Sequence, residues 1–508
     1  MKIMQVTVQV EQAETASAEV LVLTHCEGEA LAKQGASPLD RALGGALSKL
    51  VQSKEFEGKA NEVLLYHTQD KVPAKRLVLV GLGKKNEVTL ETIRQAMGSA
   101  AKRVRQAKVG SFAVVLPTVK PGKMSWIEVA QAMVEGAILG SYQFTVYRSE
   151  AASGQDVAEM RILAQQKDQL RQVTEGVRRG VATAEATVFV RDLCNHPSNI
   201  LTPTRVADEA KTVAKTDGIT IKILEQKEME QLGMGALLGV SRGSQEPPKF
   251  IILEYNGTKK KDERPVVQVG KTITFDTGGI SLKPAENMEH MKADMTGGAE
   301  VLASIRAAAR LKLPLRLISI LPVAENMPGG RAMKPGDIVT TLSGKTVEVQ
   351  NTDAEGRLIL ADGLAYAMRY KPAALIDIAT LTGACVVALG QFAIGMFGTD
   401  QALKEQVRKS GQKAGERVWE MPLWEEYFEQ LKSDVADMRN IGGRGGGMIT
   451  AALFLSKFVG DCPWVHLDIA STDWSERERA YIPKGPTGIG TRLLLQYLID
   501  RSLQAGQG

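Results

Sequence analysis

Acidic and basic residues gather at two glycine-containing stretches in the second half of the sequence. The first, residues 269–279, ends in Phe-Asp-Thr-Gly-Gly, and the second is the octapeptide Asn-Thr-Asp-Ala-Glu-Gly-Arg-Leu at 351–358. Four carboxylates from these stretches and the residues between them form the candidate ligand set: Asp276, Asp294, Asp353 and Glu355. Divalent cations prefer oxygen ligands, and pairs of ions about 3.5 to 4 Å apart need carboxylates that bridge them. The pattern predicts a site for two metal ions.

Charge balance favours two metal ions over one. Four converging carboxylates without compensation repel one another and become partly protonated, whereas two divalent cations neutralise them. Lys283 and Arg357 then stay available for a substrate. Asp353 and Glu355 stand two residues apart in a segment that we expect to be extended, so their side chains should point to the same side.

Each of these acids also has an ordinary structural interpretation. A lone Asp-x-Glu in a turn, such as Asp353 with Glu355, is usually solvated, and Asp276 before Thr-Gly-Gly can simply set a turn. Asp294 can be a first-turn acid that a helix dipole stabilises. The metal site is favoured by the combination, because charged residues in apolar surroundings need partners.

Buried strands are predicted to precede these residues and to hold them in place. Near-continuous apolar runs predict strands at 219–224, 250–255, 266–269, 315–321, 375–378 and 465–469. Such runs are typical of strands buried on both faces of a largely parallel or mixed sheet. Ligands of these sheets bind beyond the carboxyl ends of the strands, which is where the two acidic stretches fall.

A chain of 508 residues exceeds the size at which one core stops growing, so two domains are expected. Short apolar strands alternate with helix-like segments in residues 1–165, which predicts a smaller N-terminal α/β domain. A helical period before the break at 195–199 predicts a connecting helix at 166–194. Residues 195–508 then form the larger C-terminal α/β domain, whose mostly parallel central sheet carries the metal site.

Amino-acid composition bears on the partners and the cellular location of the protein. The formal net charge is +5 without a run of like charges, so charge indicates no partner. Four widely spaced cysteines suggest neither a disulfide framework nor a zinc knuckle, and the N-terminus lacks a signal-peptide pattern, so we expect a cytoplasmic protein. The uncharged stretch 378–399 reads as a buried strand, a glycine turn and a short packed helix rather than a membrane span.

The two acidic stretches, residues 291–295 and above all the octapeptide at 351–358 closely resemble the leucyl aminopeptidase (cytosol aminopeptidase) family of dinuclear metallopeptidases. Further likeness covers nearly all of the sequence after residue 190, including 199–203, 433–437, 440–444 and 466–470. Residues before 165 show only a general α/β pattern. The resemblance implies release of the N-terminal amino acid, preferably a leucine-like one, from peptides and amino-acid amides.

The resemblance also implies roles for the metal ligands. Asp276 and Glu355 would bridge two divalent ions, Mn²⁺ or Zn²⁺. Asp353 would complete the more exchangeable site, and Lys271 with Asp294 the tighter one. An amine ligand must be neutral, so Lys271 can ligate only if burial and the neighbouring cation lower its pKa.

The same resemblance implies which residues bind the substrate and which assist catalysis. A water that bridges the metals would be the nucleophile, Lys283 would polarise the scissile carbonyl, and Arg357 would hold a bicarbonate ion as general base. The free α-amine would contact a metal and Asp294. The pocket for the N-terminal side chain would be lined by Met291, Thr380, Gly383 and Ala470. Peptides would be the substrates, and the implied assembly is a homohexamer.

Two other functions stay open. Two-metal phosphoester hydrolysis also uses carboxylate pairs, although such sites seldom recruit lysine and the octapeptide disfavours it. Some bacterial members of the family double as DNA-binding accessory proteins, and the modest charge excess neither supports nor excludes nucleic-acid binding here. Thr296 and Glu300 depart from the pattern that we expect in the helix after Asp294, which bears on fine specificity.

Overall fold

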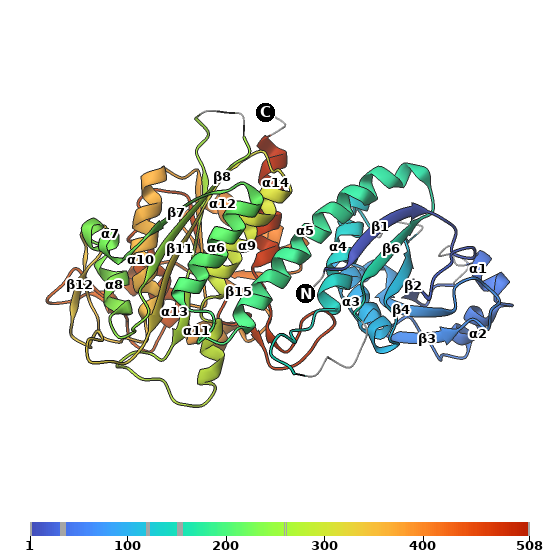
Figure 1. Cartoon of the computed structure of the whole chain (residues 1–508), viewed down its shortest axis with the longest axis horizontal. Coiled ribbons are helices and arrows are strands. Elements are labelled where there is room, and N and C mark those ends of the chain that lie inside the picture. Colours follow the sequence, from blue (N-terminus) through green and yellow to red (C-terminus); the bar gives the residue numbers. More distant parts are fainter. Residues whose placement is uncertain are drawn as a thin grey trace. The chain divides into compact units, whose positions relative to one another are not determined.

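The computed structural model describes residues 3–30, 37–117, 122–149, 156–258, 260 and 262–505. The chain divides into two compact units, shown in Figure 1. Unit 1 comprises Met1–Val188 and Glu476–Lys484, and unit 2 comprises Phe189–Ser475 and Gly485–Gly508. Helix α5, Leu170–Asn195, contains the division between them. Among the described residues, no helix has the length and apolar character needed to cross a membrane.

Unit 1 is built on a six-stranded sheet of order β1-β6-β5-β2-β4-β3. All neighbouring pairs are parallel except β3 with β4. The strands are β1 (Gln5–Val10), β2 (Val20–Glu27), β3 (Val63–His67), β4 (Arg76–Lys84), β5 (Ser111–Val115) and β6 (Glu159–Ala164). The helices of this unit are α1 (Ser37–Ala42), α2 (Ala46–Gln52), α3 (Leu90–Gln106) and α4 (Trp126–Gly140).

Helices α3 and α4 pack closely in unit 1 because glycines line their contact. A Cβ on Gly140 would lie 2.6 Å from Gly98 Cα, and a Cβ on Gly136 would lie 2.1 Å from the Arg94 carbonyl oxygen. The Arg94 guanidinium and the Glu135 carboxylate form a buried ion pair of 2.7 Å. Pairing satisfies both charges where water is absent.

Unit 2 is built on a nine-stranded sheet of order β16-β15-β18-β14-β9-β11-β8-β7, with β10 paired to β11. The central pairs of β18, β14, β9 and β11 are parallel, whereas β15/β18, β11/β8 and β8/β7 are antiparallel. The strands are β7 (Thr220–Leu224), β8 (Lys249–Asn256), β9 (Val266–Gly270), β10 (Thr272–Asp276), β11 (Arg316–Asn326), β14 (Ala374–Ala379), β15 (Ile394–Gly398), β16 (Val418–Glu420) and β18 (Trp464–Asp468). The expected two-domain α/β fold with a mostly parallel central sheet is confirmed.

Helices cover both faces of this sheet. Val267, Val269, Ile318 and Ile320 join the core formed with α10 (Glu355–Ala367). The alternate side chains face α9 (Thr296–Arg310), where Ser304 Oγ donates to Gln268 Oε1. Because successive strand residues point to opposite faces, α9 and α10 lie on opposite sides of the sheet.

Shorter elements complete unit 2. Its other helices are α6 (Pro203–Asp217), α7 (Gln226–Leu232), α8 (Gly235–Ser241), α11 (Gly383–Leu389), α12 (Gln401–Ala414), α13 (Gly447–Ser456) and α14 (Thr491–Ala505). A 3₁₀ helix, η4 (Met288–Ala293), precedes α9. Strands β12 (Ile338–Thr340), β13 (Thr346–Glu348) and β17 (Met438–Arg439) form a small separate sheet.

Candidate metal centre

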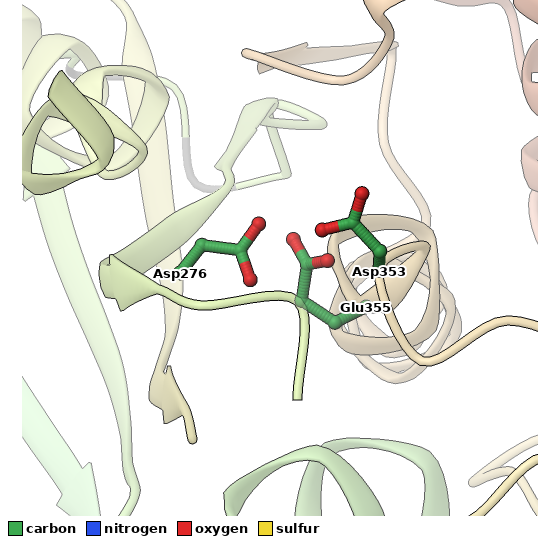
Figure 2. A group of neighbouring side chains, drawn as sticks. All are labelled: Asp276, Asp353 and Glu355. Atoms are coloured by element: carbon green, nitrogen blue, oxygen red, sulfur yellow. The ribbon is translucent and has the colours of Figure 1, made fainter. Parts of the chain in front are cut away.

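Three carboxylates converge beyond the carboxyl ends of the central strands. Asp276 is the last residue of β10, Glu355 is the first residue of α10, and Asp353 lies in the turn before α10. Their ligand oxygens all lie within 4.8 Å of one another, and Figure 2 shows the three groups pointing together. The expected extended segment is wrong, because Glu355 already begins a helix. A turn followed by the first helical residue brings the two acids together instead.

Lys271 is placed by an unusually close approach of α9 to the sheet. It follows β9 directly, and its carbonyl oxygen accepts a hydrogen bond from the Gly298 N–H at 2.8 Å. A Cβ on Gly297 would lie 2.1 Å from the Ile378 carbonyl oxygen, and a Cβ on Gly298 would lie 2.0 Å from Thr272 Oγ1. The glycine pair therefore allows α9 to begin against the residue that carries the amine.

The side chain of Lys271 reaches the buried part of the cluster. Its Nζ lies 2.7 Å from Asp294 Oδ1 and 2.9 Å from Glu355 Oε1, and it donates to the Thr380 carbonyl oxygen at 2.9 Å. The side chain passes beside Gly356, where a Cβ would lie 2.5 Å from Lys271 Cε. The glycine of the octapeptide thus leaves the space that Lys271 occupies.

Lys283 contacts the more exposed part of the cluster. Its Nζ lies 2.8 Å from Asp276 Oδ2 and 2.5 Å from Asp353 Oδ1, and its side chain is 22% exposed. Gly278 and Gly279, with φ of +85° and +68°, form the turn between Asp276 and Lys283. Left-handed backbone favours glycine, so the turn after the strand depends on both residues.

Burial and neighbouring charges shift the pKa values of several side chains in the cluster. Burial opposes the charged form of Lys271, yet the carboxylates of Asp294 and Glu355 raise its pKa. Burial raises the pKa values of Asp294, Glu355 and Asp353, and neighbouring carboxylates raise them further. Among the side chains alone, the acids therefore hold protons more tightly and the lysine remains charged.

The residues fit a divalent cation. Two lysines offset only part of the charge of four carboxylates, and Asp294 Oδ2 and Glu355 Oε2 are buried without a hydrogen-bond donor in the described part of the chain. Buried carboxylate oxygens need a compensating charge or donor. Carboxylates with one amine are a donor set suited to hard or borderline divalent ions.

Arg357 is buried beside the cluster and is held by Asn440. Its Nη1 donates to the Asn440 carbonyl oxygen at 2.8 Å, and its Nε has no acceptor among the described residues. Burial lowers the pKa of Arg357 to about 10, against the opposing effect of Glu355 and Asp468. Such a guanidinium has unused capacity to bind an anion.

The predicted pocket residues group around Asp294 and Asp468. Thr380 Oγ1 donates to Asp294 Oδ1 at 2.7 Å, so this hydroxyl fixes a carboxylate of the cluster. Ala470 N–H donates to Asp468 Oδ1, which also accepts from the N–H groups of Leu381 and Thr382. Gly383 begins α11, next to these residues in sequence, and a Cβ there would have no atom within 4 Å. Met291, in η4, accepts a hydrogen bond from the Asp294 N–H through its carbonyl oxygen.

Two buried asparagines that the sequence did not single out support the octapeptide. Asn326 Nδ2 donates to Asp276 Oδ1 and to the Thr352 carbonyl oxygen. Asn440 accepts from Gln350 N–H through Oδ1 and donates to the Asn351 carbonyl oxygen through Nδ2. Asn440 stands in a segment that carries the family likeness, whereas Asn326 lies outside the motifs and carried no signal.

Comparisons with known proteins agree with this geometry. The model of the cytosol aminopeptidase family catalytic domain matches residues 188–495, and that of its N-terminal domain matches residues 20–151. A probable cytosol aminopeptidase of Geobacter sp. (strain M21) is 49% identical over 465 residues, 90% of this chain and 92% of the relative. A probable cytosol aminopeptidase of Roseiflexus castenholzii is 46% identical over 500 residues, 98% of this chain and 99% of the relative.

Solved structures extend the likeness to the whole fold. A mutant of tomato leucine aminopeptidase superposes with a TM-score of 0.86 at 33% identity, covering 98% of this chain and 96% of the other. The bottromycin maturation enzyme BotP in complex with Mn has a TM-score of 0.84 at 36% identity, covering 96% and 100%. The fold, the acidic cluster and the matches to the family models and relatives together define a metal-dependent aminopeptidase with two α/β domains. The chain belongs to the cytosol aminopeptidase family.

Proposed function

We propose that the protein is a leucyl-type aminopeptidase that uses two divalent ions, Mn²⁺ or Zn²⁺, to release N-terminal amino acids. The observation that supports this most is the convergence of Lys271 and four carboxylates, with two buried carboxylate oxygens that lack a donor in the described structure. When bound, the ions would lower the pKa of a water molecule, which would then serve as the nucleophile. The relative in complex with Mn supports the choice of metal.

The proposed ligand roles follow the positions of the side chains. Asp276 and Glu355 would hold both ions, because the two carboxylates lie side by side and each contacts one of the two lysines, Lys283 and Lys271 respectively. Lys271 and Asp294, 2.7 Å apart in the buried part, would complete the tighter site. Asp353, which lies on the more open side with Lys283, would complete the exchangeable one. Lys271 must lose its proton to serve as a ligand, which bound cations favour.

Lys283 and Arg357 would act on the substrate and on the proton. Lys283 is partly exposed and charged, since the acids around it raise its pKa against the effect of burial. It can therefore donate to the scissile carbonyl oxygen and stabilise the negative charge that develops there. The bicarbonate that we propose as general base would be held by Arg357, whose Nε has no acceptor within the described residues.

Asp294 and the pocket residues would select the substrate end. Asp294 Oδ2 has no donor within the described residues and can accept a hydrogen bond from the free α-amine of the substrate, which would restrict cleavage to the terminal residue. Met291, Thr380, Gly383 and Ala470 would line the pocket of the N-terminal side chain. Small and apolar lining suits leucine-like residues.

The setting that we propose is a cytoplasmic homohexamer that acts on peptides. The names of the relatives support the location, and the four cysteines, all within the described residues, form no disulfide. We further propose that residues 195–508 carry the activity, that 166–194 connect the domains, and that 1–165 form the N-terminal domain.

Hydrolysis of three model substrates tests the proposed specificity. The purified protein with Mn²⁺ should cleave leucyl amide, and acetylation of the α-amine should abolish cleavage because a neutral amide cannot pair with Asp294. A phosphodiester should not be hydrolysed. Efficient cleavage of N-acetyl-leucyl amide would contradict the pocket assignment, and phosphodiester hydrolysis without amide hydrolysis would contradict the proposed chemistry.

A further inference from the structure

Asn326 lies directly beside Asp276, one of the carboxylates of the cluster. It ends β11 and is in register with Asp276 at the end of β10. Its side chain is buried, and both amide hydrogens are used. Nδ2 donates to Asp276 Oδ1 at 2.7 Å and to the Thr352 carbonyl oxygen at 3.0 Å. One amide group therefore links Asp276 to the octapeptide.

The two carboxylate oxygens of Asp276 have different partners. Oδ1 accepts from Asn326 and also from the Gly278 N–H at 2.8 Å. These two donors occupy both lone pairs of that oxygen. Oδ2 instead faces the cluster, where it lies 2.8 Å from Lys283 Nζ. Asp276 can thus offer a cation only Oδ2 while Asn326 is in place.

Asn326 is itself held rigidly. The main-chain carbonyl oxygen of Asn326 accepts hydrogen bonds from Thr277 N–H at 3.0 Å and from Thr277 Oγ1 at 2.8 Å. A Cβ on Gly279 would lie 2.8 Å from Asn326 Oδ1, so the glycine turn packs against the amide. A rigid donor transmits its orientation to the carboxylate that it binds.

We propose that Asn326 is a positioning residue for the aminopeptidase reaction, which holds Asp276 so that Oδ2 alone faces the two metal ions. This inference rests on the proposed two-metal function. Residues that hydrogen-bond to ligating carboxylates orient them, and their loss typically weakens metal binding about 10- to 100-fold.

A purely structural role for Asn326 would consist of supporting the octapeptide. Asn440 provides a matched comparison, because its side chain holds the same loop through Gln350 N–H at 2.8 Å and the Asn351 carbonyl oxygen at 2.7 Å. Among the described residues, Asn440 makes no hydrogen bond to Asp276. Loss of Asn440 therefore disturbs the loop but leaves the orientation of Asp276 to Asn326.

The test compares Mn²⁺ binding in the full-length protein and its Asn326→Leu, Asn326→Ser and Asn440→Ser variants. Each protein is stripped of metal, checked for its fold by circular dichroism, and titrated with Mn²⁺ by calorimetry, and the Mn²⁺ spin coupling is recorded by electron paramagnetic resonance. We expect both Asn326 variants to bind Mn²⁺ about 10- to 100-fold more weakly with altered coupling. Asn440→Ser should weaken Mn²⁺ binding less than either Asn326 variant does, because the Asn440 side chain holds the loop without a hydrogen bond to a ligand carboxylate.

Three results would overturn the inference while the proposed function stands. They are unchanged Mn²⁺ binding in the folded Asn326 variants, an equal loss in Asn440→Ser, or failure of both Asn326 variants to fold, which would assign the residue to the fold alone. Absence of Mn²⁺ binding in the wild type would instead contradict the proposed two-metal function itself.

Discussion

Replacing Lys283 with alanine separates electrophilic assistance from metal binding. The ammonium group contacts two of the proposed ligands, Asp276 and Asp353, but is not itself among the proposed ligands. Its removal takes away the donor proposed for the scissile carbonyl. It also takes away a positive charge beside the cation site, which lowers repulsion. Activity and metal binding should therefore respond differently.

The expected size of the effect follows from the position of the amine. Loss of one preorganised donor to a developing negative charge costs roughly 10² to 10³ in kcat, or about 2.7 to 4 kcal/mol. The side chain of Lys283 is 22% exposed, so water can replace part of the lost interaction. We therefore expect a loss near 10², at the lower end of that range.

The assay measures kcat on leucyl amide and the Mn²⁺ content of the same samples. Lys334→Ala is the matched control, because Lys334 is an exposed lysine of unit 2 whose ion pair is with the neighbouring Asp337. Lys283→Ala should keep its metal and lose turnover, and the control should change neither. Full activity in Lys283→Ala, or loss of its metal, would refute the division into ligands and electrophile.

Three further perturbations test other parts of the account. Arg357→Ala should retain metal with a smaller loss of kcat than Lys283→Ala and should lose stimulation by added bicarbonate; unchanged stimulation would remove the proposed anion site. Gly356→Ala should weaken Mn²⁺ binding, because its Cβ would lie 2.5 Å from Lys271 Cε, whereas Gly330→Ala, with no atom within 4 Å, should not. Burial raises the pKa of Asp362 to about 7, although the hydrogen bonds that its carboxylate accepts from backbone N–H groups oppose this shift. The protonated side chain therefore contributes its full stability below the unfolded pKa of about 3.9, and this contribution is lost as the pH rises through 7. Melting temperatures from pH 4 to 8 should therefore fall less steeply in Asp362→Asn than in the wild type, and equal slopes would contradict this assignment.

The sequence predicted the sheet well, and it singled out three acids that the structure brings together, because strands and acid-glycine turns leave local signals. Buried strands give continuous apolar runs, and the runs at 250–255 and 266–269 correspond to β8 and β9. Asp276 and Glu355 stand beside glycines that mark the ends of elements. Local pattern was misleading where a helix began early, since Asp353 and Glu355 looked like part of an extended segment.

Contacts between distant segments could not be predicted in this way. Asn326 meets Asp276 across 50 residues, and its surroundings in the sequence do not distinguish it from a surface asparagine. Thr380 was predicted to line the pocket, but its hydrogen bond to Asp294 was not predicted, because the two residues are 86 positions apart in the sequence. The stretch 378–399 was expected to contain a packed helix, yet Val387 of α11 is 89% exposed. Only the assembled fold determines which face of such an element is covered.

Two divalent ions are proposed to form the reactive centre, and metal stoichiometry measured alongside activity is the decisive test of that proposal. The full-length protein is stripped by a chelator, verified as metal-free by mass spectrometry, and titrated with Mn²⁺ while leucyl amide hydrolysis is followed. We predict no activity without metal and full activity at two ions per chain, with Asp276→Ala and Glu355→Ala binding fewer ions. Full activity in the verified metal-free protein, or a maximum at one ion per chain, would contradict the account.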